Sequence, residues 1–406
     1  MSSSADLVVV GAGTVGGWAS WFASEMGARV VVVERDLAGQ GASSRAAGIV
    51  RAQGGTPTTV RLGLWALDFY ERQQSLIGTD SGFRRLGYLL LARDEEEAAE
   101  GRVRVEMQRT AGHDVRWLSE AEARALDPNL SGAPFAGASY SPVEGAIDPP
   151  RNVRAYSLAM QRGGVELRER CECSGLLLDE DNDGNQRVVG VRAGGEEIRC
   201  SRVLLTGGPS LGELGRQLGL SLPVGGARHQ VAITEPCPEL AGGPLPMAFE
   251  LGSGIYWRQE EGGLLFGMSD PHETPGEARL LNWDYLEEVR ARVAEMLPVT
   301  AGLGLRKAWA ATIDYTSDHL PILGPALDTE RRPIEGTTVA SPAGHGMMWG
   351  PAVARAAADL AMTGETDVVD VSELGLERFD AEGRSRLATD AVALPFPVDT
   401  GAPASA

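Results

Sequence analysis

The chain has 406 residues, of which 43% are hydrophobic, and this length suits two globular domains with sizeable cores. Its 56 acidic residues exceed its 37 basic residues, and the formal net charge of −19 repels nucleic acid and anionic membrane surfaces. No run approaches the ~20 apolar residues of a membrane helix, and the chain enters its first strand without a basic and apolar leader. We therefore expect a cytoplasmic protein that binds neither nucleic acid nor membranes.

The first expected elements have the order of a nucleotide-binding βαβ unit. An apolar strand over residues 7–10 leads into GAGTVGG, a helix follows to about Met26, and a second strand lies within ARVVVVE. Gly11, Gly13 and Gly16 form G-x-G-x-x-G at the start of the helix. Such glycines allow a tight turn, close approach of a pyrophosphate and close helix packing, while the helix N-terminus offers unpaired N–H groups to phosphates.

Glu34 strengthens this interpretation. It stands at the end of the second strand, about twenty residues after the glycines, where a carboxylate can accept hydrogen bonds from both hydroxyls of a ribose. An acidic side chain there disfavours a 2′-phosphate. The pattern therefore predicts a bound adenine dinucleotide rather than a glycine-rich turn without a ligand.

Helix caps and apolar runs predict the next elements. They are a helix from Thr56 to Gly78 with proline in its first turn, a strand over 83–92, an acidic surface helix within 93–112, a helix capped by Ser119 and Glu122, and a helix from Asp148 with proline just inside. Strands rich in glycine and polar turns follow, up to the apolar SRVLLTGGPS.

One acidic turn in this region imitates a calcium loop. Asp179, Asp181 and Asp183 alternate before Gly184, but the twelfth position, where such a loop needs a bidentate glutamate, is Gly190. We therefore expect a solvated hairpin turn and no metal site. Reduced thiols are expected at the four cysteines, which lack metal-ligand spacing: Cys171, Cys173, Cys200 and Cys237.

The pattern changes to short alternating strands between about 226 and 320, with one amphipathic helix near 282–297. This predicts antiparallel sheet and a second domain. A strand near GTTVASP and an alanine-rich helix ending near Gly364 follow, and we expect a frayed tail over 393–406.

The segment GQGASSRAAGIVR, at residues 39–51, indicates which dinucleotide is bound. It offers hydroxyls and backbone donors for a second phosphate and a flavin edge, which nicotinamide enzymes do not usually need. Together with VVVGAGTVGG, Glu34, RVLLTGG, YTSDHLPILG and AGHGMMWGP, it resembles the flavin amine oxidoreductases: D-amino acid and glycine oxidases, sarcosine oxidases, and sarcosine and dimethylglycine dehydrogenases. The resemblance extends over nearly the whole chain.

This resemblance implies an α/β, overall α+β, architecture. A Rossmann-like FAD-binding domain would comprise residues 1–82, 140–225 and 320–380, and a mainly antiparallel substrate domain of residues 83–139 and 226–319 would cover the flavin, with a C-terminal tail over 381–406. The implied FAD-binding residues are Gly11, Gly13, Thr14, Val15, Gly16, Glu34, Arg35, Ala42, Ser43, Ser44, Arg45, Ala47, Gly48, Ile49, Thr206, Gly207, Gly208, Gly344, His345, Gly346, Met347 and Met348.

The text SSRAAGIVR and TSDHLPILG is most similar to the sarcosine oxidase β-subunit branch, and two departures from relatives imply that FAD is bound without a covalent link. Dimethylglycine and sarcosine dehydrogenases attach FAD to a histidine in W-H-A-A-G, where this chain has Arg45. Monomeric sarcosine oxidases attach it to a cysteine ahead of a Y-T pair, where this chain has Ile313.

Arg51 is the residue that the resemblance favours for holding a substrate carboxylate. Glycine oxidases place an arginine for this task near Ile313, whereas sarcosine oxidases use one that matches Arg51, and a guanidinium fits a carboxylate bidentately. The alternative for Arg51 is a surface or interdomain ion pair. Met348 replaces a lysine that helps to grip the carboxylate in monomeric sarcosine oxidases, which suggests a less anionic or more apolar substrate, or one held by Arg51 alone. His345 is expected to fix its turn rather than to move protons.

Each of four further polar residues has a functional interpretation and a structural or solvent-facing alternative. Tyr256 and Arg258 alternate on one strand face and are predicted to converge above the flavin, although alternation also describes a solvent-facing strand. Asp314 stands where the β-subunit branch often has a glutamate; it would receive a cationic amine or serve as a strand-end structural residue. His229 is another candidate, for which a hydrogen-bonded structural role is favoured.

The implied reaction is hydride transfer from the C–H beside an amine nitrogen to flavin N5, followed by hydrolysis of the imine. The helix after GHGMMWGP would place its positive end near the flavin. Oxygen and another electron acceptor both stay open, although Leu265 replaces the oxygen-activating lysine of monomeric sarcosine oxidases and so favours another acceptor. The oligomeric state also stays open.

Two rival classes share part of this pattern. A FAD-binding subunit of a larger dehydrogenase is one, although Pro150 replaces the FMN-linking histidine of the sarcosine oxidase complex. A nicotinamide-dependent dehydrogenase is the other, and it leaves GASSRAAG and AGHGMM unexplained.

Overall fold

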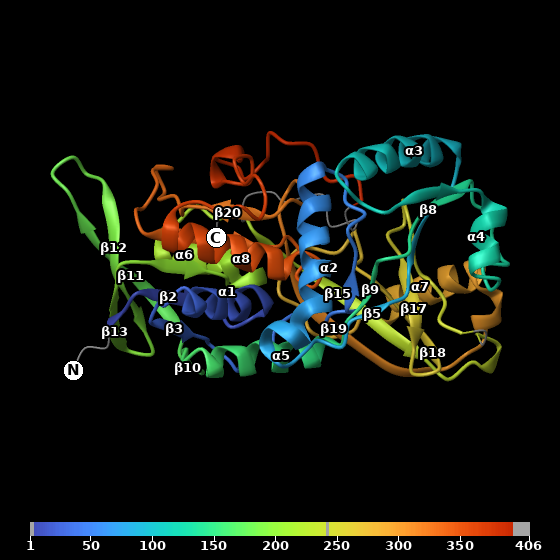
Figure 1. Ribbon diagram of the computed structural model, residues 1–406, viewed down its shortest axis with the longest axis horizontal. Helices are drawn as coiled ribbons and strands as arrows, with labels where there is room; N and C mark the ends of the chain where they lie inside the picture. Colours follow the sequence, from blue (N-terminus) through green and yellow to red (C-terminus); the bar gives the residue numbers. More distant parts are fainter. Residues whose placement is uncertain (1–3, 241–242, 393–406) are drawn as a thin grey trace.

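The computed structural model describes residues 4–240 and 243–392 (Figure 1). Its strands form four sheets, of six, eight, four and three strands. None of the helices in the described segments is long and apolar enough to cross a membrane. The fold is a mixed α/β structure, as the sequence predicted.

The six-stranded sheet contains the predicted nucleotide-binding unit. Its order is β10-β3-β2-β14-β21-β20, and every neighbouring pair is parallel except β20 with β21. The strands are β2 (Leu7–Val10), β3 (Val30–Val33), β10 (Glu166–Arg168), β14 (Val203–Leu205), β20 (Ile322–Gly324) and β21 (Thr337–Ser341). Residues from the beginning, middle and end of the chain therefore meet in one sheet.

Both faces of the central strands are covered, which explains their unbroken valine runs. Leu7, Val9, Val30 and Val32 pack with three helices, α1 (Thr14–Glu25), α5 (Pro149–Arg162) and α8 (Gly350–Thr363). The alternate residues Val8, Val10, Val31 and Val33 pack with a four-stranded sheet, β1 (Ser4–Ala5), β13 (Glu196–Cys200), β12 (Gln186–Ala193) and β11 (Cys173–Glu180). Figure 1 shows α1 and α8 side by side, although they lie near opposite ends of the chain.

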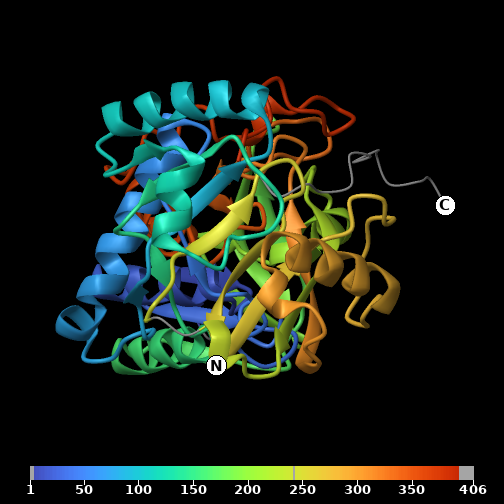
Figure 2. The same cartoon turned by 90° about the vertical axis from the view of Figure 1, so that its right-hand side faces the viewer.

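The eight-stranded sheet has the order β19-β15-β18-β17-β16-β6-β8-β7, and only β16 with β6 is parallel. The strands are β6 (Tyr88–Ala92), β7 (Arg116–Leu118), β8 (Gly137–Ser141), β15 (Gly225–Thr234), β16 (Met247–Glu250), β17 (Tyr256–Glu260), β18 (Gly263–Met268) and β19 (Leu305–Tyr315). The sheet packs with α3 (Glu95–Thr110), α4 (Glu120–Leu126) and α7 (Trp283–Met296), and α3 runs along the top edge in Figure 2.

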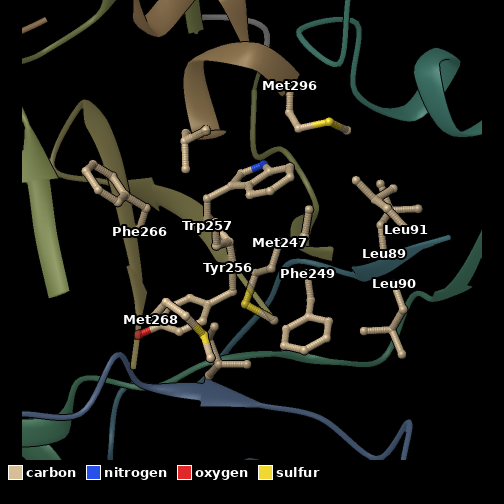
Figure 3. Close-up of a cluster of buried hydrophobic side chains, with 14 of the residues drawn as sticks. Leu89, Leu90, Leu91, Met247, Phe249, Tyr256, Trp257, Phe266, Met268 and Met296 are labelled. Carbon is tan, nitrogen blue, oxygen red and sulfur yellow. The ribbon is translucent and has the colours of Figure 1, made fainter. Parts of the chain in front are cut away.

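The two faces of this sheet have different surroundings. Trp257 points toward Met296 of α7, whereas Tyr256 and Phe249 lie on the opposite side of the strands (Figure 3). Because side chains alternate along a strand, one of two neighbouring residues of β17 points into the helix-covered core and the next points to the opposite face. That second face holds the residues described below.

The helix caps are as expected. Thr56 caps α2 (Pro57–Ile77) by a capping box with Thr59, and Gly78 ends it with φ +72°, which glycine adopts readily. Ser119 caps α4 with Glu122, and Asp148 caps α5. The alanine-rich α8 ends at Gly364.

The single strand predicted over 83–92 is wrong. Residues 84–85 form β5 (Arg84–Arg85), which pairs with β9 (Gly145–Ala146), and β9 also pairs with β4 (Ile49–Val50). β6 belongs to the eight-stranded sheet instead. Gly87, at φ +76°, turns the chain between the two, and the amides of Leu86 and Gly87 both donate to the Glu144 carbonyl.

The acidic turn at 181–185 is the predicted hairpin. Asp181 Oδ1 accepts from the amides of Asp183 and Asn185, each at 2.9 Å, between β11 and β12. Its carboxylate therefore caps its own turn. The four cysteines are free, and the described residues contain no group of three or more histidines, cysteines or carboxylates that could hold a metal ion.

The segment after α8 returns to the middle of the molecule. A buried ion pair joins Arg378 Nε to Asp318 Oδ2 at 2.7 Å, and Asp390 accepts from the amide of Gly55 and from Thr59 Oγ1 at 3.1 Å. Residues up to 392 are therefore packed beside the start of α2. The tail predicted over 393–406 lies outside the described residues.

Candidate active site

A cavity extends from the carboxyl ends of β2, β3 and β14 to the eight-stranded sheet. The predicted FAD-binding residues that line it are Gly11, Gly13, Thr14, Val15, Glu34, Arg35, Ala42, Ser43, Arg45, Ala47, Gly48, Ile49, Thr206, Gly207, Gly208, Gly344, His345, Gly346, Met347 and Met348. Of the predicted substrate-side residues, Arg51, Tyr256, Asp314 and Met348 line it. Gly16, Ser44 and Arg258 do not.

Gly16 packs against the glycine-rich turn and does not line the cavity. A Cβ at Gly16 would stand 1.9 Å from the Gly11 carbonyl oxygen, and one at Gly11 would stand 2.8 Å from that of Thr206. Gly11 also has φ +103°, which favours glycine. The glycines therefore let α1 pack tightly against β2 and β14 and leave the turn open toward the cavity.

The start of α1 suits a phosphate. Its N-cap, Gly13, has no side chain to satisfy the first amides. The Thr14 amide donates to Ser43 Oγ at 2.9 Å, which brings the 39–51 segment beside the helix N-terminus. The remaining N–H groups and the positive end of the helix dipole would stabilise an anion bound at this place.

Glu34 is fixed by the backbone. Its Oε2 accepts from the Ala12 amide at 2.8 Å, and its Oε1 accepts from the Asp36 amide at 2.9 Å. The carboxylate therefore stands rigidly at the cavity wall, where its other lone pairs are available for the two hydroxyls of a ribose. Arg35 and Ser210 both donate to Glu277 Oε1, at 3.1 and 2.9 Å, and this contact closes a loop over the same end of the cavity.

Arg258 has a different place from the predicted one. Its Nε and Nη2 donate to the Ala47 carbonyl at 3.1 and 2.9 Å, and its Nη1 pairs with Glu260. Arg258 lies on the same face of β17 as Tyr256, as strand alternation predicts, but its guanidinium is hydrogen-bonded to the 39–51 segment. Arg258 therefore holds the wall of the cofactor cavity and does not reach the substrate end. Trp309 Nε1 adds a bond to the Arg45 carbonyl at 2.8 Å.

The AGHGMMWGP turn is rigid. Ala343 and Gly344 have φ +48° and +83°, and His345 Nδ1 donates to the Ala343 carbonyl at 2.8 Å while its ring stacks on Trp349 at 4.1 Å. Burial holds the pKa of His345 well below its usual range, so the ring is neutral. Its Nε2 is buried without a partner in the described structure, and it is therefore an acceptor available at the cavity.

Asp314 supports the same turn. Its Oδ2 accepts from Ser341 Oγ at 2.5 Å, and that hydroxyl oxygen in turn accepts from the Ala343 amide at 3.2 Å. Burial raises the pKa of Asp314 above its usual value, and the hydrogen bond from Ser341 opposes the shift. Of the two readings of Asp314, the contacts agree with the structural one, although the side chain also lines the cavity.

Arg51 lies at the substrate end and is only 3% exposed. Its Nη2 donates to the Val392 carbonyl at 2.6 Å, its Nη1 donates to the Gln53 carbonyl, and its Nε has no partner. No carboxylate pairs with it among the residues that the structure describes, so the ion pair considered as its alternative is not formed there. Phe249 stands under the guanidinium at 5.7 Å.

The network that holds Arg51 could not be predicted from the sequence. Glu144 Oε1 accepts from the amides of Ala52 and Gln53 at 2.6 and 2.7 Å and contacts His113 Nε2 at 3.1 Å, and its Oε2 accepts from Gln53 Nε2 at 2.8 Å. All of these groups are buried. No local motif marks Glu144, because its partners lie on remote segments.

The turn and the cavity fit a dinucleotide with a redox-active ring at its far end, and they define a dinucleotide-dependent oxidoreductase. A family model described as FAD dependent oxidoreductase matches residues 6–360, and the chain belongs to this family, with FAD as its cofactor. Glu34 and the glycines suit the adenosine and pyrophosphate, and the 39–51 and 343–348 segments suit the ring end.

Curated relatives agree with this assignment. The chain is 27% identical to 4-methylaminobutanoate oxidase (formaldehyde-forming) of Paenarthrobacter nicotinovorans over 93% of this chain and 46% of that protein. It is 30% identical to glycine oxidase of Pseudomonas aeruginosa over 90% of this chain and 96% of that protein. The chain therefore spans about half the length of the first of these relatives and nearly all of the second.

Solved structures show the same fold. Glycine oxidase from Geobacillus kaustophilus superposes with a TM-score of 0.78 at 26% identity, over 93% of this chain and all of that one. L-proline dehydrogenase from P. horikoshii superposes with a TM-score of 0.83 at 23% identity, over 92% of this chain and 97% of that one.

Proposed function

We propose that the protein oxidises the C–N bond of a secondary amine or amino acid that carries a carboxylate, such as a sarcosine-like, other N-methyl or cyclic amino acid. The observation that carries this proposal is Arg51, a buried guanidinium at the cavity with an unpartnered Nε and no ion pair in the described structure. A buried charge without a counter-ion is costly, and a substrate carboxylate would satisfy it. The named substrates of the relatives, 4-methylaminobutanoate and glycine, are also amino acids.

The walls around Arg51 support a substrate of moderate apolar bulk. Tyr88, Phe249, Ile313 and Met348 line the same cavity as Arg51, and they come from four separate parts of the chain. Met348 supplies no second cation, so the carboxylate would rest on Arg51 and on neutral donors. We infer that the rest of the substrate packs against these apolar groups, as N-alkyl and cyclic amino acids do.

In this proposal the chain binds and orients, and FAD supplies the ring that accepts a hydride equivalent. Arg51 would hold the carboxylate, and His345 Nε2 would accept a hydrogen bond from the amine N–H, because it is the unpartnered acceptor of a neutral ring. The substrate amine would react in its neutral form, and the eight-stranded sheet would exclude water from the C–H bond. The resulting imine hydrolyses in water to a carbonyl compound and an amine.

The domain arrangement supports the same reading. We propose that residues 1–82, 140–225 and 320–380 form the FAD-binding domain and that 83–139 and 226–319 form the substrate domain. The six-stranded sheet falls wholly in the first set of segments, and nearly all of the eight-stranded sheet falls in the second.

We also propose an electron acceptor other than oxygen. Leu265, which stands on β18 opposite Arg258 in register, supplies no cation to stabilise reduced oxygen. The alternative, an oxidase, would produce hydrogen peroxide in step with the amine consumed. Measuring peroxide against dye reduction in the same reaction separates the two.

The substrate class is tested by steady-state turnover with an artificial dye acceptor and a panel of amines with and without a carboxylate. Arg51→Met should raise KM for carboxylate-bearing amines roughly 10- to 100-fold, the loss of a charge-assisted bond. Arg61→Met, at an exposed position on α2, is the control and should have no effect. Equal KM values for Arg51→Met and the native protein would contradict the proposal.

A further inference from the structure

Tyr256 stands at the cavity wall at the end of a hydrogen-bonded chain. His229 Nε2 lies 2.6 Å from Tyr256 Oη, and His229 Nδ1 lies 2.8 Å from Ser269 Oγ. The rings of His229 and Tyr256 are nearly parallel, at 11°, with centroids 5.6 Å apart. His229 lies on β15, Tyr256 on β17, and Ser269 directly after β18. Tyr256 and His229 line the cavity.

The inventory of donors limits how this chain can be arranged. Burial lowers the pKa of His229 to about 4, so its ring is neutral near pH 7 and has one N–H donor and one bare acceptor nitrogen. Ser269 and Tyr256 each have a single O–H. Each of these hydroxyls has His229 as its only side-chain hydrogen-bond partner among the residues described.

Two arrangements are possible, and they leave different donors unused. If His229 carries its proton on Nδ1, it donates to Ser269 Oγ and accepts from Tyr256, and the Ser269 hydrogen is left without an acceptor. Ser269 is 0% exposed and does not line the cavity, so that hydroxyl would be buried and unsatisfied. If the proton is on Nε2, Ser269 donates to Nδ1, Nε2–H donates to Tyr256 Oη, and the unused donor is the Tyr256 O–H at the cavity wall.

We propose that Ser269 holds His229 in the Nε2–H form, and that His229 thereby turns the Tyr256 hydroxyl into a donor aimed at the substrate carboxylate. This rests on the proposed function. Arg51 lies over Phe249, which pairs with Tyr256 in register, so Tyr256 and Arg51 Nε then bind the same anionic group. His345 Nε2, in the opposite tautomer, is left for the amine N–H. His229 and Ser269 are positioning residues that act through Tyr256, and they set the preference for a carboxylate over a neutral group.

The local backbone is built to keep Ser269 in place. Tyr285 Oη, from α7, donates to the Ser269 carbonyl at 2.8 Å. Gly267 lies opposite Tyr256 in register, and a Cβ there would stand 2.5 Å from Tyr256 Oη. The glycine therefore leaves room for the hydroxyl to reach His229.

The direct test is the tautomer of His229 in the FAD-loaded protein, measured by ¹H–¹⁵N NMR of ¹⁵N-histidine-labelled protein at pH 7.5. The chain has five histidines, so the His229→Gln variant assigns the signal by its disappearance. The proposal predicts a protonated Nε2 and a bare Nδ1. A protonated Nδ1 would overturn it, whether or not any amine is oxidised.

Kinetics separate this positioning role from a purely structural one. Ser269→Ala should raise KM for a carboxylate-bearing amine roughly tenfold and leave KM for the matching amine without a carboxylate within about twofold. Ser269→Thr, which keeps the hydroxyl, should restore the native KM. Equal effects on both amines, or no rescue by threonine, would contradict the assignment. If no amine is turned over at all, the proposed function fails, while the tautomer is still decided by NMR.

Discussion

Arg51 shows how a binding residue depends on groups that never touch the ligand. The Glu144 carboxylate accepts hydrogen bonds from the amides of Ala52 and Gln53, which follow Arg51 directly, and His113 Nε2 contacts the same carboxylate. The guanidinium is thereby aimed by its own backbone rather than by a neighbouring acid. A carboxylate in salt-bridge contact would neutralise Arg51, whereas this arrangement leaves its charge for the substrate.

Replacing Glu144 should test this support. In Glu144→Gln, one amide NH₂ group must face either the backbone amides or the Gln53 side chain, which now donate to Glu144. We expect a loss of about 2–4 kcal/mol in the free energy of unfolding and a higher KM for carboxylate-bearing amines. Denaturant unfolding and dye-linked turnover measure the two effects. Glu96→Gln, at an exposed position of α3, is the control.

The attachment of FAD is also decided at single residues. Arg45 donates to the carbonyls of Gln40 and Gly41, and Ile313 is an apolar wall residue, so neither offers a nucleophile to the cofactor. We predict that trichloroacetic acid releases all of the flavin into the supernatant. Yellow colour that stays with the precipitated protein would show a covalent link through some other residue.

At the scale of the elements, the segment that follows α8 closes the substrate end. Asp390 binds the Gly55 amide and Thr59 at the start of α2, and this brings the Val392 carbonyl onto Arg51 Nη2 at 2.6 Å. The contact joins residues 341 positions apart. Arg51 is thus held by its own neighbours on one side and by this returning segment on the other.

Asp390→Ala should therefore loosen the substrate site. Loss of both acceptors frees Val392 from Arg51, and we expect KM for carboxylate-bearing amines to rise roughly 3- to 10-fold, with faster proteolytic cleavage after residue 380. Asp380→Ala, at an exposed site on the same segment, is the matched control. An unchanged KM in Asp390→Ala would mean that the returning segment has no part in substrate binding.

The elements also show what local sequence can predict. The caps at Thr56, Ser119 and Asp148 were predictable because each is satisfied within three residues of itself. The division of 83–92 into two strands was not, because it depends on Glu144 and on β9, which lie far along the chain. The contacts of Arg258 could not be predicted for the same reason. Alternation indicated its strand face, but its partner, the Ala47 carbonyl, lies on a remote segment.

For the whole molecule, three histidines whose pKa values are lowered in the folded protein make stability depend on pH. Burial lowers the pKa of His229 and of His319 to about 4 and that of His345 well below its usual range. Between pH 6.5 and 4 these three histidines bind more protons in the unfolded chain than in the folded one, so their contribution to stability is lost as the pH falls through this window. The stabilisation is fully present above pH 6.5.

His229→Gln should make that dependence shallower. One histidine with its pKa lowered from 6.5 to about 4 accounts for about 3 kcal/mol across the window. We expect the variant to lose less stability than the native protein between pH 6.5 and 4, by about that amount, in denaturant unfolding followed by circular dichroism. Parallel curves for the two proteins would show that His229 is not buried neutral.

At this scale, most of the residues predicted for the cofactor line one cavity, whereas the contacts at the substrate end could not be predicted from the sequence. The glycines, Glu34 and the 39–51 and 343–348 segments are short motifs, so their chemistry could be read before their positions were known. The substrate end is assembled from residues of β6, β15, β16 and β17 and from Arg51, which precedes α2. His229 and Ser269, the partners of Tyr256, meet it only when the eight-stranded sheet forms.

The central claim is that one chain binds FAD and reduces it with an amine. Anaerobic addition of N-methyl, cyclic and D- or L-amino acids to the FAD-loaded protein tests it most directly, by the flavin absorption band at about 450 nm. We predict that at least one carboxylate-bearing amine bleaches the band within minutes and that the same amine without its carboxylate is much slower. If dithionite bleaches the flavin and no amine does, the account of the reaction is wrong.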